Sequence, residues 1–183
     1  MRRRKRRCRG TQMNDSKLDE PALGWAAGSE TPRSDDPPLP DRIRRLTTTQ
    51  PFAVLCTQGD EQPYGSLIAF AVTDDLSAAV FSTPVATRKY RLLSQCDRVA
   101  LLIDSRAEHP DNMMEVEALT ATGRAVQVPR GEEFERLAPM LIGRHPQLAD
   151  FVNSPSCALF RIEIVRYFHV TRFQQVSQWA PRS

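Results

Sequence analysis

The sequence predicts a mainly β protein with α-helical decoration, built on a six- to seven-stranded antiparallel β-barrel. Strand-like apolar runs recur from residue 51 to the C-terminal end, and short polar turns separate the first three of them. Parallel strands need crossover connections of a dozen residues or more, so these short turns favour antiparallel pairing. Only two or three helical patterns interrupt the strands, which favours a small decorated barrel over a layered α/β fold.

The first ordered elements are predicted to be a short helix and a three-stranded meander. The helix covers residues 40–46. The strands cover residues 51–57, 64–73 and 78–83, and the breaker-rich turn 58–63 and the polar turn 74–77 connect them.

The stretch 81–93 follows the meander and is the most informative part of the chain. An apolar strand passes through Ser82, Thr83 and Pro84 into a helix that we predict from Thr87 to Cys96. Arg88 and Lys89 fall in the first turn of this helix. A helix N-terminus offers unpaired backbone N–H groups and the positive end of a dipole, which attract phosphate. The hydroxyls, Arg88 and Lys89 therefore favour a phosphate site, and the alternative is an ordinary solvated basic helix face.

The second half of the chain adds four strands and two helices. The strands are predicted at residues 98–104, 118–128, 157–171 and 174–179, and the helices at 131–143 and 148–152. Gly123 within strand 118–128 indicates a bulge or a close backbone approach. The segment 105–115 is predicted to be a polar loop, and its His109, Asp111 and Asn112 do not identify a catalytic site.

The charge is distributed unevenly along the chain. Seven of the 25 basic residues lie between positions 2 and 9, so the other 18 face all 22 acidic residues and give the rest of the chain a balance of −4. We therefore expect residues 1–37 to be a disordered basic and polar tail, and residues 38–183 to form one folded domain. The tail is either a nucleic-acid or lipid contact or simply a solvated segment.

Composition excludes several function classes. The folded part is mildly acidic and lacks a basic face with interleaved aromatic residues, so we expect it not to bind nucleic acid. No apolar run is long enough to span a bilayer, and the default expectation is a cytoplasmic protein without a membrane partner. The four cysteines and three histidines are scattered, so no metal site is predicted, and Cys56 and Cys157 are expected to be small apolar residues near strands.

The order of these motifs resembles the flavin-binding split barrel proteins related to pyridoxamine 5'-phosphate oxidase. The similarity extends over residues 40–181, and its most specific part is Thr87-Arg88-Lys89-Tyr90 following Ser82-Thr83. The other segments that carry it are 63–71, 98–104, 119–125, 167–170 and Trp179. The resemblance implies a split β-barrel that forms a homodimer and binds FMN at the dimer interface.

The resemblance also implies which residues contact FMN. Arg88 and Lys89 would bind the phosphate, with Thr87 at the same turn and with Ser82 and Thr83 beside the phosphate and the ribityl chain. Three residues, Ser66, Leu67 and Ile68, would run along the isoalloxazine ring. Trp179 would approach the flavin from the partner chain.

Two departures argue against vitamin B6 oxidation. Ser66 stands where the oxidases proper have arginine, and the C-terminal end lacks the Arg-x-His segment that holds pyridoxal phosphate in those enzymes. No catalytic residue is identified, since a bound flavin transfers hydride through its own ring. The sequence is therefore expected to encode an FMN-dependent oxidoreductase or flavin reductase with a small-molecule redox substrate, whose pocket Tyr64, His169 or Trp179 would line. The alternative is a non-catalytic flavin- or haem-binding protein of the same fold, with His145 and His169 as the plausible haem ligands.

Overall fold

The computed structural model describes residues 37–59, 62–172 and 175–181. The predicted tail at residues 1–37 lies almost entirely outside these residues, and its disorder stays a prediction. Four α-helices and eight strands are present in the described part of the chain. Among these described helices, none combines the length and apolar character that crossing a membrane requires.

The elements follow the predicted order closely. The helices are α1 (Leu39–Thr49), α2 (Arg88–Gln95), α3 (Glu132–Arg144) and α4 (Ala149–Asn153), with a 3-10 turn η1 (Pro146–Leu148) before α4. The strands are β1 (Phe52–Gly59), β2 (Gln62–Ala69), β3 (Ala71–Val72), β4 (Ala78–Pro84), β5 (Arg98–Asp104), β6 (Ala118–Val128), β7 (Cys157–Thr171) and β8 (Gln175–Trp179). Strands β2 and β3 are two parts of the single strand predicted at 64–73, interrupted at Phe70. The fold is therefore the predicted one, and its eight strand segments correspond to the seven predicted strands.

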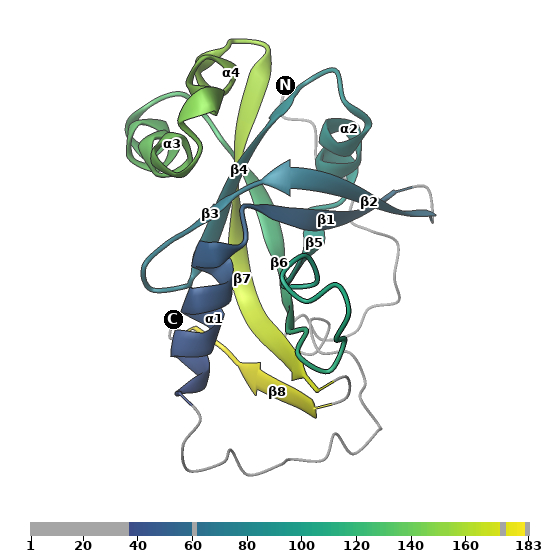
Figure 1. Ribbon diagram of the computed structural model, residues 1–183. Coiled ribbons are helices and arrows are strands. Elements are labelled where there is room, and N and C mark those ends of the chain that lie inside the picture. Colours follow the sequence, from purple (N-terminus) through teal and green to yellow (C-terminus); the bar gives the residue numbers. More distant parts are fainter. Residues whose placement is uncertain (1–36, 60–61, 173–174, 182–183) are drawn as a thin grey trace.

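All strands belong to one antiparallel sheet that curls into a half-barrel (Figure 1). The strand order is β2-β1-β5-β6-β7-β4-β3, and β8 adds to β7. The concave side holds the main core, in which Leu55, Phe81 and Leu101 are fully buried. Alternation along β5 and β6 explains this core, because every second residue of a strand points to the same face.

Gly123 lies at the predicted irregularity of β6. The register against β7 shifts between Thr122, which pairs with Arg166, and Gly123, which pairs with Ile164. A Cβ atom at Gly123 would lie 2.1 Å from the carbonyl oxygen of Glu163. Both expectations for this glycine, a bulge and a close backbone approach, are confirmed.

Helices α3 and α4 pack beside β4 and β7 at one end of the sheet (Figure 1). They form a second apolar cluster in which Leu137, Leu141 and Val152 are buried. Pro139 lies inside α3 without ending the helix. This second cluster places the C-terminal half of α3, η1 and α4 next to the β4–α2 turn.

The convex side of the sheet is only partly covered and is rich in apolar residues. Val54 pairs with Leu67 on one side and with Leu102 on the other, and Leu102 pairs with Thr120. These cross-strand partners share one face. Cys56 in β1 is exposed on the same face and Cys157 in β7 is half-buried, so both lie in strands as expected, but the burial that is usual for a free cysteine does not hold for Cys56.

Candidate functional site

The turn from β4 into α2 is organised by the hydroxyl of Thr87. Thr87 is the N-cap residue of α2, and its Oγ1 accepts a hydrogen bond from the backbone N–H of Tyr90 at 3.3 Å. The same hydroxyl donates to the carbonyl oxygen of Pro84 at 2.8 Å. An N-cap side chain of this kind satisfies one of the unpaired N–H groups of the first turn. The cap therefore fixes where α2 begins.

The hydroxyl hydrogens around this turn are used internally. A threonine hydroxyl has one hydrogen, and that of Thr87 is donated to Pro84, so the 3.0 Å contact between Thr83 and Thr87 has Thr83 as its donor. Ser82 donates to the carbonyl oxygen of Ala158 at 3.2 Å. The groups still able to donate toward a phosphate are the first-turn N–H groups of Arg88 and Lys89 and the ammonium group of Lys89.

Lys89 connects α2 to β2. Its Nζ donates a hydrogen bond to the backbone carbonyl oxygen of Leu67 at 3.1 Å. The side chain is half-buried, and this burial lowers the pKa of its ammonium group. An ammonium group has three hydrogens, so two remain for another acceptor. A bound anion would compensate the cost of burying this charge.

Arg88 contacts a different residue of β2 from Lys89. Its guanidinium carbon lies 4.9 Å from the ring centroid of Tyr64, the geometry of a cation–π contact on an exposed arginine. Ser66 alternates with Tyr64 along β2 and therefore points to the same side of this strand. The Ser66 Oγ atom is buried and has no hydrogen-bond partner among the described residues.

A pocket of about 230 Å³ lies between β2, the β4–α2 turn and the α3–α4 segment. Six of the nine predicted cofactor-binding residues line it: Leu67, Ile68, Ser82, Thr83, Thr87 and Lys89. Ala69 and Pro84 complete this side of the pocket. Residues far apart in the sequence are thus brought together as the phosphate hypothesis requires. Ser66, Arg88 and Trp179 do not line the pocket.

The opposite wall was missed by the sequence interpretation. It consists of Leu141 from α3, Leu148 at the end of η1 and Phe151 from α4. Leu148 and Phe151 are half-buried, whereas Leu141 is 1% exposed. Their apolar spacing predicts core helices, and no sequence signal distinguishes a core residue from an apolar pocket wall.

Trp179 lies far from this pocket within one chain. It pairs with Tyr167 across β7 and β8, with the two ring centroids 5.9 Å apart. Figure 1 shows β8 at the opposite end of the molecule from α3 and α4. The proposed approach of Trp179 to a flavin therefore requires a second chain.

The three histidines have different surroundings, and none lines the pocket. His145 is 3% exposed, and its Nε2 contacts the carbonyl oxygen of Phe70 at 3.0 Å. His169 is 1% exposed and bonded through Nε2 to Glu117 at 2.8 Å, so the expectation that it lines the substrate pocket is wrong. His109 is half-buried, and its Nδ1 lies 3.1 Å from the exposed carboxylate of Glu115.

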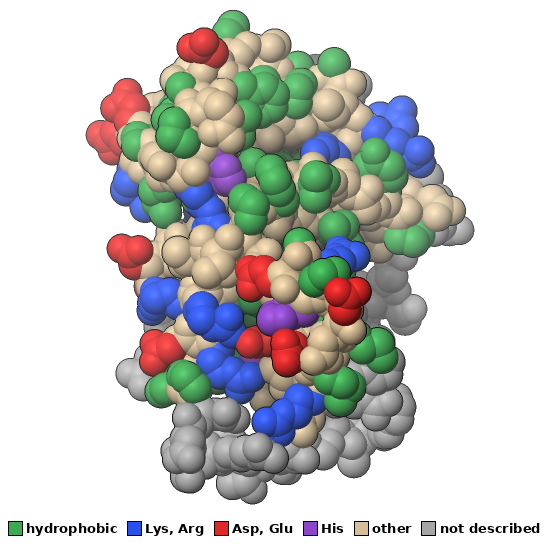
Figure 2. Space-filling model, viewed as in Figure 1, with side chains coloured by type: hydrophobic (Ala, Val, Ile, Leu, Met, Phe, Trp, Pro, Cys, Tyr) green, Lys and Arg blue, Asp and Glu red, His purple; other side chains and the backbone are tan. Residues whose placement is uncertain are grey.

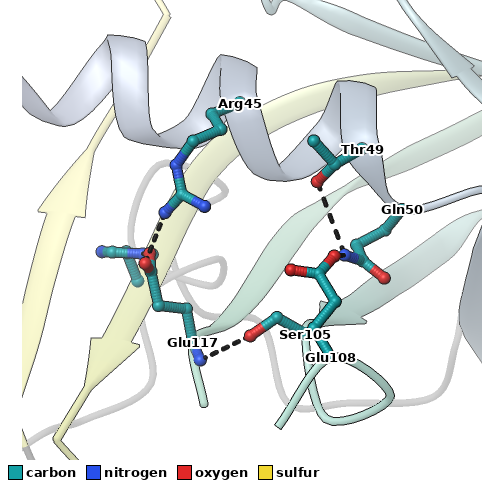
Figure 3. A network of polar contacts seen from close by, with 7 residues as sticks. Arg45, Thr49, Gln50, Ser105, Glu108 and Glu117 are labelled. Carbon is teal, nitrogen blue, oxygen red and sulfur yellow. Dashed lines mark hydrogen bonds and ion pairs between the residues drawn. The ribbon is translucent and has the colours of Figure 1, made fainter. Parts of the chain in front are cut away.

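A polar network surrounds Glu117 at the base of the 105–117 loop (Figure 3). Its carboxylate accepts from His169 and forms an ion pair with Arg45, and its backbone N–H donates to Ser105 Oγ at 2.9 Å. The hydrogen bond from His169 and the positive charge of Arg45 lower the pKa of Glu117 to about 2, despite its partial burial. Because His169 is buried, we assign the network a structural role that holds α1, β7 and the loop together.

Comparison with known proteins supports the fold. The family model described as pyridoxamine 5'-phosphate oxidase matches residues 39–171, which include α1 through β7 but not β8 with Trp179. A search of curated protein sequences finds no significant match.

Solved structures share the fold at low sequence identity. A heme binding protein from Mycobacterium smegmatis has a TM-score of 0.71 and 15% identity, with 80% of this chain and 59% of that chain covered. The heme storage protein HutZ from Vibrio cholerae has a TM-score of 0.60 and 16% identity over 68% and 88% of the two chains. An FAD-binding protein from Mesorhizobium loti has a TM-score of 0.57 and 16% identity over 70% and 91%. This chain thus spans about three fifths of the length of the Mycobacterium smegmatis chain.

Proposed function

The chain belongs to the pyridoxamine 5'-phosphate oxidase family, and on this premise we propose that it is an FMN-dependent oxidoreductase or flavin reductase that binds FMN at a homodimer interface. The observation that carries the proposal is the 230 Å³ pocket, which gathers six predicted cofactor-binding residues around the N-terminus of α2. Its only charged lining residue among the described residues is Lys89. A helix N-terminus with one half-buried cation matches a phosphate monoester.

The residues present fit the phosphate end of FMN. The first-turn N–H groups of α2 and the ammonium group of Lys89 would hold the phosphate oxygens, while Thr83 and Thr87 keep the turn in shape. Ser66 lies outside the lining of this pocket, so its hydroxyl is not part of the phosphate site. Arg88 would reach the phosphate only after leaving Tyr64, so Lys89 is the primary phosphate ligand.

FMN supplies hydride transfer through its own ring, and the protein contributes binding, orientation and exclusion of water. The chain needs no nucleophile or metal for this chemistry. Backbone groups of Leu67 and Ile68 would run along the flavin from β2. Lys89 already fixes this strand through the carbonyl oxygen of Leu67.

We propose the convex face of the sheet as the homodimer interface. Figure 2 shows hydrophobic side chains gathered over β1 and β2, with charged side chains concentrated toward α1 and the 105–117 loop. Phe52 and Leu67 are 51% and 65% exposed on this face. A face of this kind, depleted of charge, is typical of the core of a homodimer interface. Leu67 also lines the pocket, so the interface and the flavin site would be adjacent.

Haem binding is the second candidate, because the structural relatives include proteins described as heme binding and heme storage. Both histidine rings are buried, and the Nε2 of each is already engaged, His145 with Phe70 and His169 with Glu117. To bind iron, either histidine would have to release this contact or expose its other ring nitrogen. The hydroxyl and ammonium groups of the pocket have no evident use in haem ligation. These observations favour flavin.

The visible spectrum of the purified full-length protein tests both candidates. We expect flavin absorption bands in the wild type, and a folded but colourless variant carrying Arg88→Ala with Lys89→Ala. Equal FMN affinity in the wild type and this double variant would refute the phosphate site. A Soret band that persists in the double variant would instead support haem.

A further inference from the structure

The pocket has two chemically different sides. The side formed by β2 and the β4–α2 turn carries the hydroxyls and Lys89, whereas Leu141, Leu148 and Phe151 form an entirely apolar wall opposite. We call these three residues the α3–α4 wall. If FMN phosphate binds at α2 as proposed above, a second molecule approaching from the α3–α4 side meets this wall.

The charges near the α3–α4 wall leave no cation for a second anionic ligand. Lys89 is the only charged residue that lines the pocket in the described part of the chain, and the FMN phosphate would use it. The nearest arginine along α3, Arg144, binds the carbonyl oxygens of Thr47, Thr48 and Gln50 with its guanidinium group. The same group lies over the ring of Phe70, 4.8 Å from its centroid. Arg144 is therefore committed to the C-terminal end of α1.

The hydroxyl donors of the pocket are also committed. The hydrogens of Ser82, Thr83 and Thr87 are donated to Ala158, Thr87 and Pro84, respectively. A phosphorylated substrate beside the FMN phosphate would thus lose its hydration without gaining a counter-charge or a hydroxyl donor from the wall. Burying a charge without such partners is strongly unfavourable. An uncharged ring, in contrast, gains from burial against leucine and phenylalanine side chains.

We propose that the α3–α4 wall binds an uncharged, apolar substrate and that the pocket discriminates against phosphorylated ones. This inference deepens the proposed function and rests on FMN occupying the α2 side. The proposed substrates are uncharged apolar ring compounds, and Leu148 and Phe151 are the residues that determine this specificity. Both side chains are half-buried and pack against the second apolar cluster, so the thermal unfolding of each variant is measured beside its binding.

The test is calorimetric titration of the full-length protein, with and without added FMN, with two probes. Menadione represents an uncharged ring, and pyridoxine 5'-phosphate, which has no aldehyde that could form an imine with lysine, represents a phosphorylated one. We expect the FMN-loaded wild type to bind menadione at least about tenfold more tightly than pyridoxine 5'-phosphate. Leu148→Lys should weaken menadione binding by about tenfold and strengthen pyridoxine 5'-phosphate binding. Phe151→Ala should weaken menadione binding without restoring the phosphorylated probe.

Gln147→Lys is the matched control, because it adds the same charge at the exposed neighbouring position. It should leave both affinities unchanged. Pyridoxine 5'-phosphate binding as tightly as menadione, or an equal response of Gln147→Lys and Leu148→Lys, would overturn the inference. Failure of the wild type to bind FMN would refute the proposed function instead. Substrate binding by the α3–α4 wall would still be supported if the FMN-free protein bound menadione and Phe151→Ala abolished that binding.

Discussion

The ammonium group of Lys89 donates a hydrogen bond to the backbone carbonyl oxygen of Leu67 at 3.1 Å and thereby joins the start of α2 to β2. The two residues are 22 positions apart in the sequence. This bond directs Lys89 into the pocket, while its neighbour Arg88 lies over Tyr64. The two basic residues that look equivalent in the sequence are therefore not equivalent in the structure.

Lys89→Ala should weaken FMN binding more than Arg88→Ala. Hydrogen bonds to charged groups are worth about 1.5–3 kcal/mol, so we expect a loss of roughly 10- to 100-fold in affinity. Riboflavin lacks the phosphate, so its affinity should change little. Fluorescence titration with both flavins measures this difference, and Arg91→Ala, on the exposed side of α2, is the control. An equal loss for FMN and riboflavin would contradict a phosphate role for Lys89.

The sequence was sufficient to predict the fold because its local signals agree with one another. Short turns implied antiparallel pairing, Gly123 marked the bulge, and Thr87 was placed at the start of α2. The different directions of Arg88 and Lys89 could not be predicted, because helical spacing does not reveal which neighbour contacts Tyr64 or Leu67. The wall residue Phe151 could not be recognised either, since apolar residues in a core helix and in a pocket wall have the same pattern.

Thr87→Ala should destabilise the protein by about 1 kcal/mol, the typical cost of losing an N-cap side chain. The substitution removes the acceptor for the Tyr90 N–H and the partner of the Thr83 hydroxyl. Thr87→Ser retains the hydroxyl and should recover most of the lost stability. Urea unfolding of the three proteins measures the effect. If the serine variant were as unstable as the alanine variant, the loss would come from the methyl group and not from the cap.

Gly123→Ala should destabilise the fold by about 2 kcal/mol or more, because its Cβ atom would lie 2.1 Å from the backbone carbonyl oxygen of Glu163. The obstacle is backbone, so a side-chain rotation cannot remove it. Gly143→Ala is the control, since its Cβ atom would meet nothing within 4 Å in helix α3. That substitution should be neutral or slightly stabilising. Similar unfolding midpoints for both variants would disprove the close approach at the bulge.

Leu102→Asp should convert the proposed homodimer into a monomer. Leu102 lies in the row that contains Val54 and Thr120 on the convex face, and a carboxylate there would be buried without a partner on association. Size-exclusion chromatography with light scattering gives the mass. Met113→Asp, at a 58% exposed position in the 105–117 loop, is the control and should remain dimeric. A dimeric Leu102→Asp protein would place the interface elsewhere.

Glu117→Gln should destabilise the protein at neutral pH and progressively less in acid. The folded state lowers the pKa of Glu117 from 4.5 to about 2, mainly through the hydrogen bond from His169. A lowered pKa means that the unfolded chain binds the proton more readily. The stabilisation by Glu117 is thus complete above pH 4.5 and is lost as the pH falls toward 2.

A shift of this size corresponds to a few kcal/mol above pH 4.5. Urea unfolding at a series of pH values should therefore show a gap between the wild type and Glu117→Gln that narrows below pH 4.5. Glu115→Gln serves as the control, because its carboxylate is 62% exposed in its ion pair with His109 and should contribute little. A gap that stays constant down to pH 2 would show that packing, and not the charge of Glu117, connects α1 and β7 to the loop.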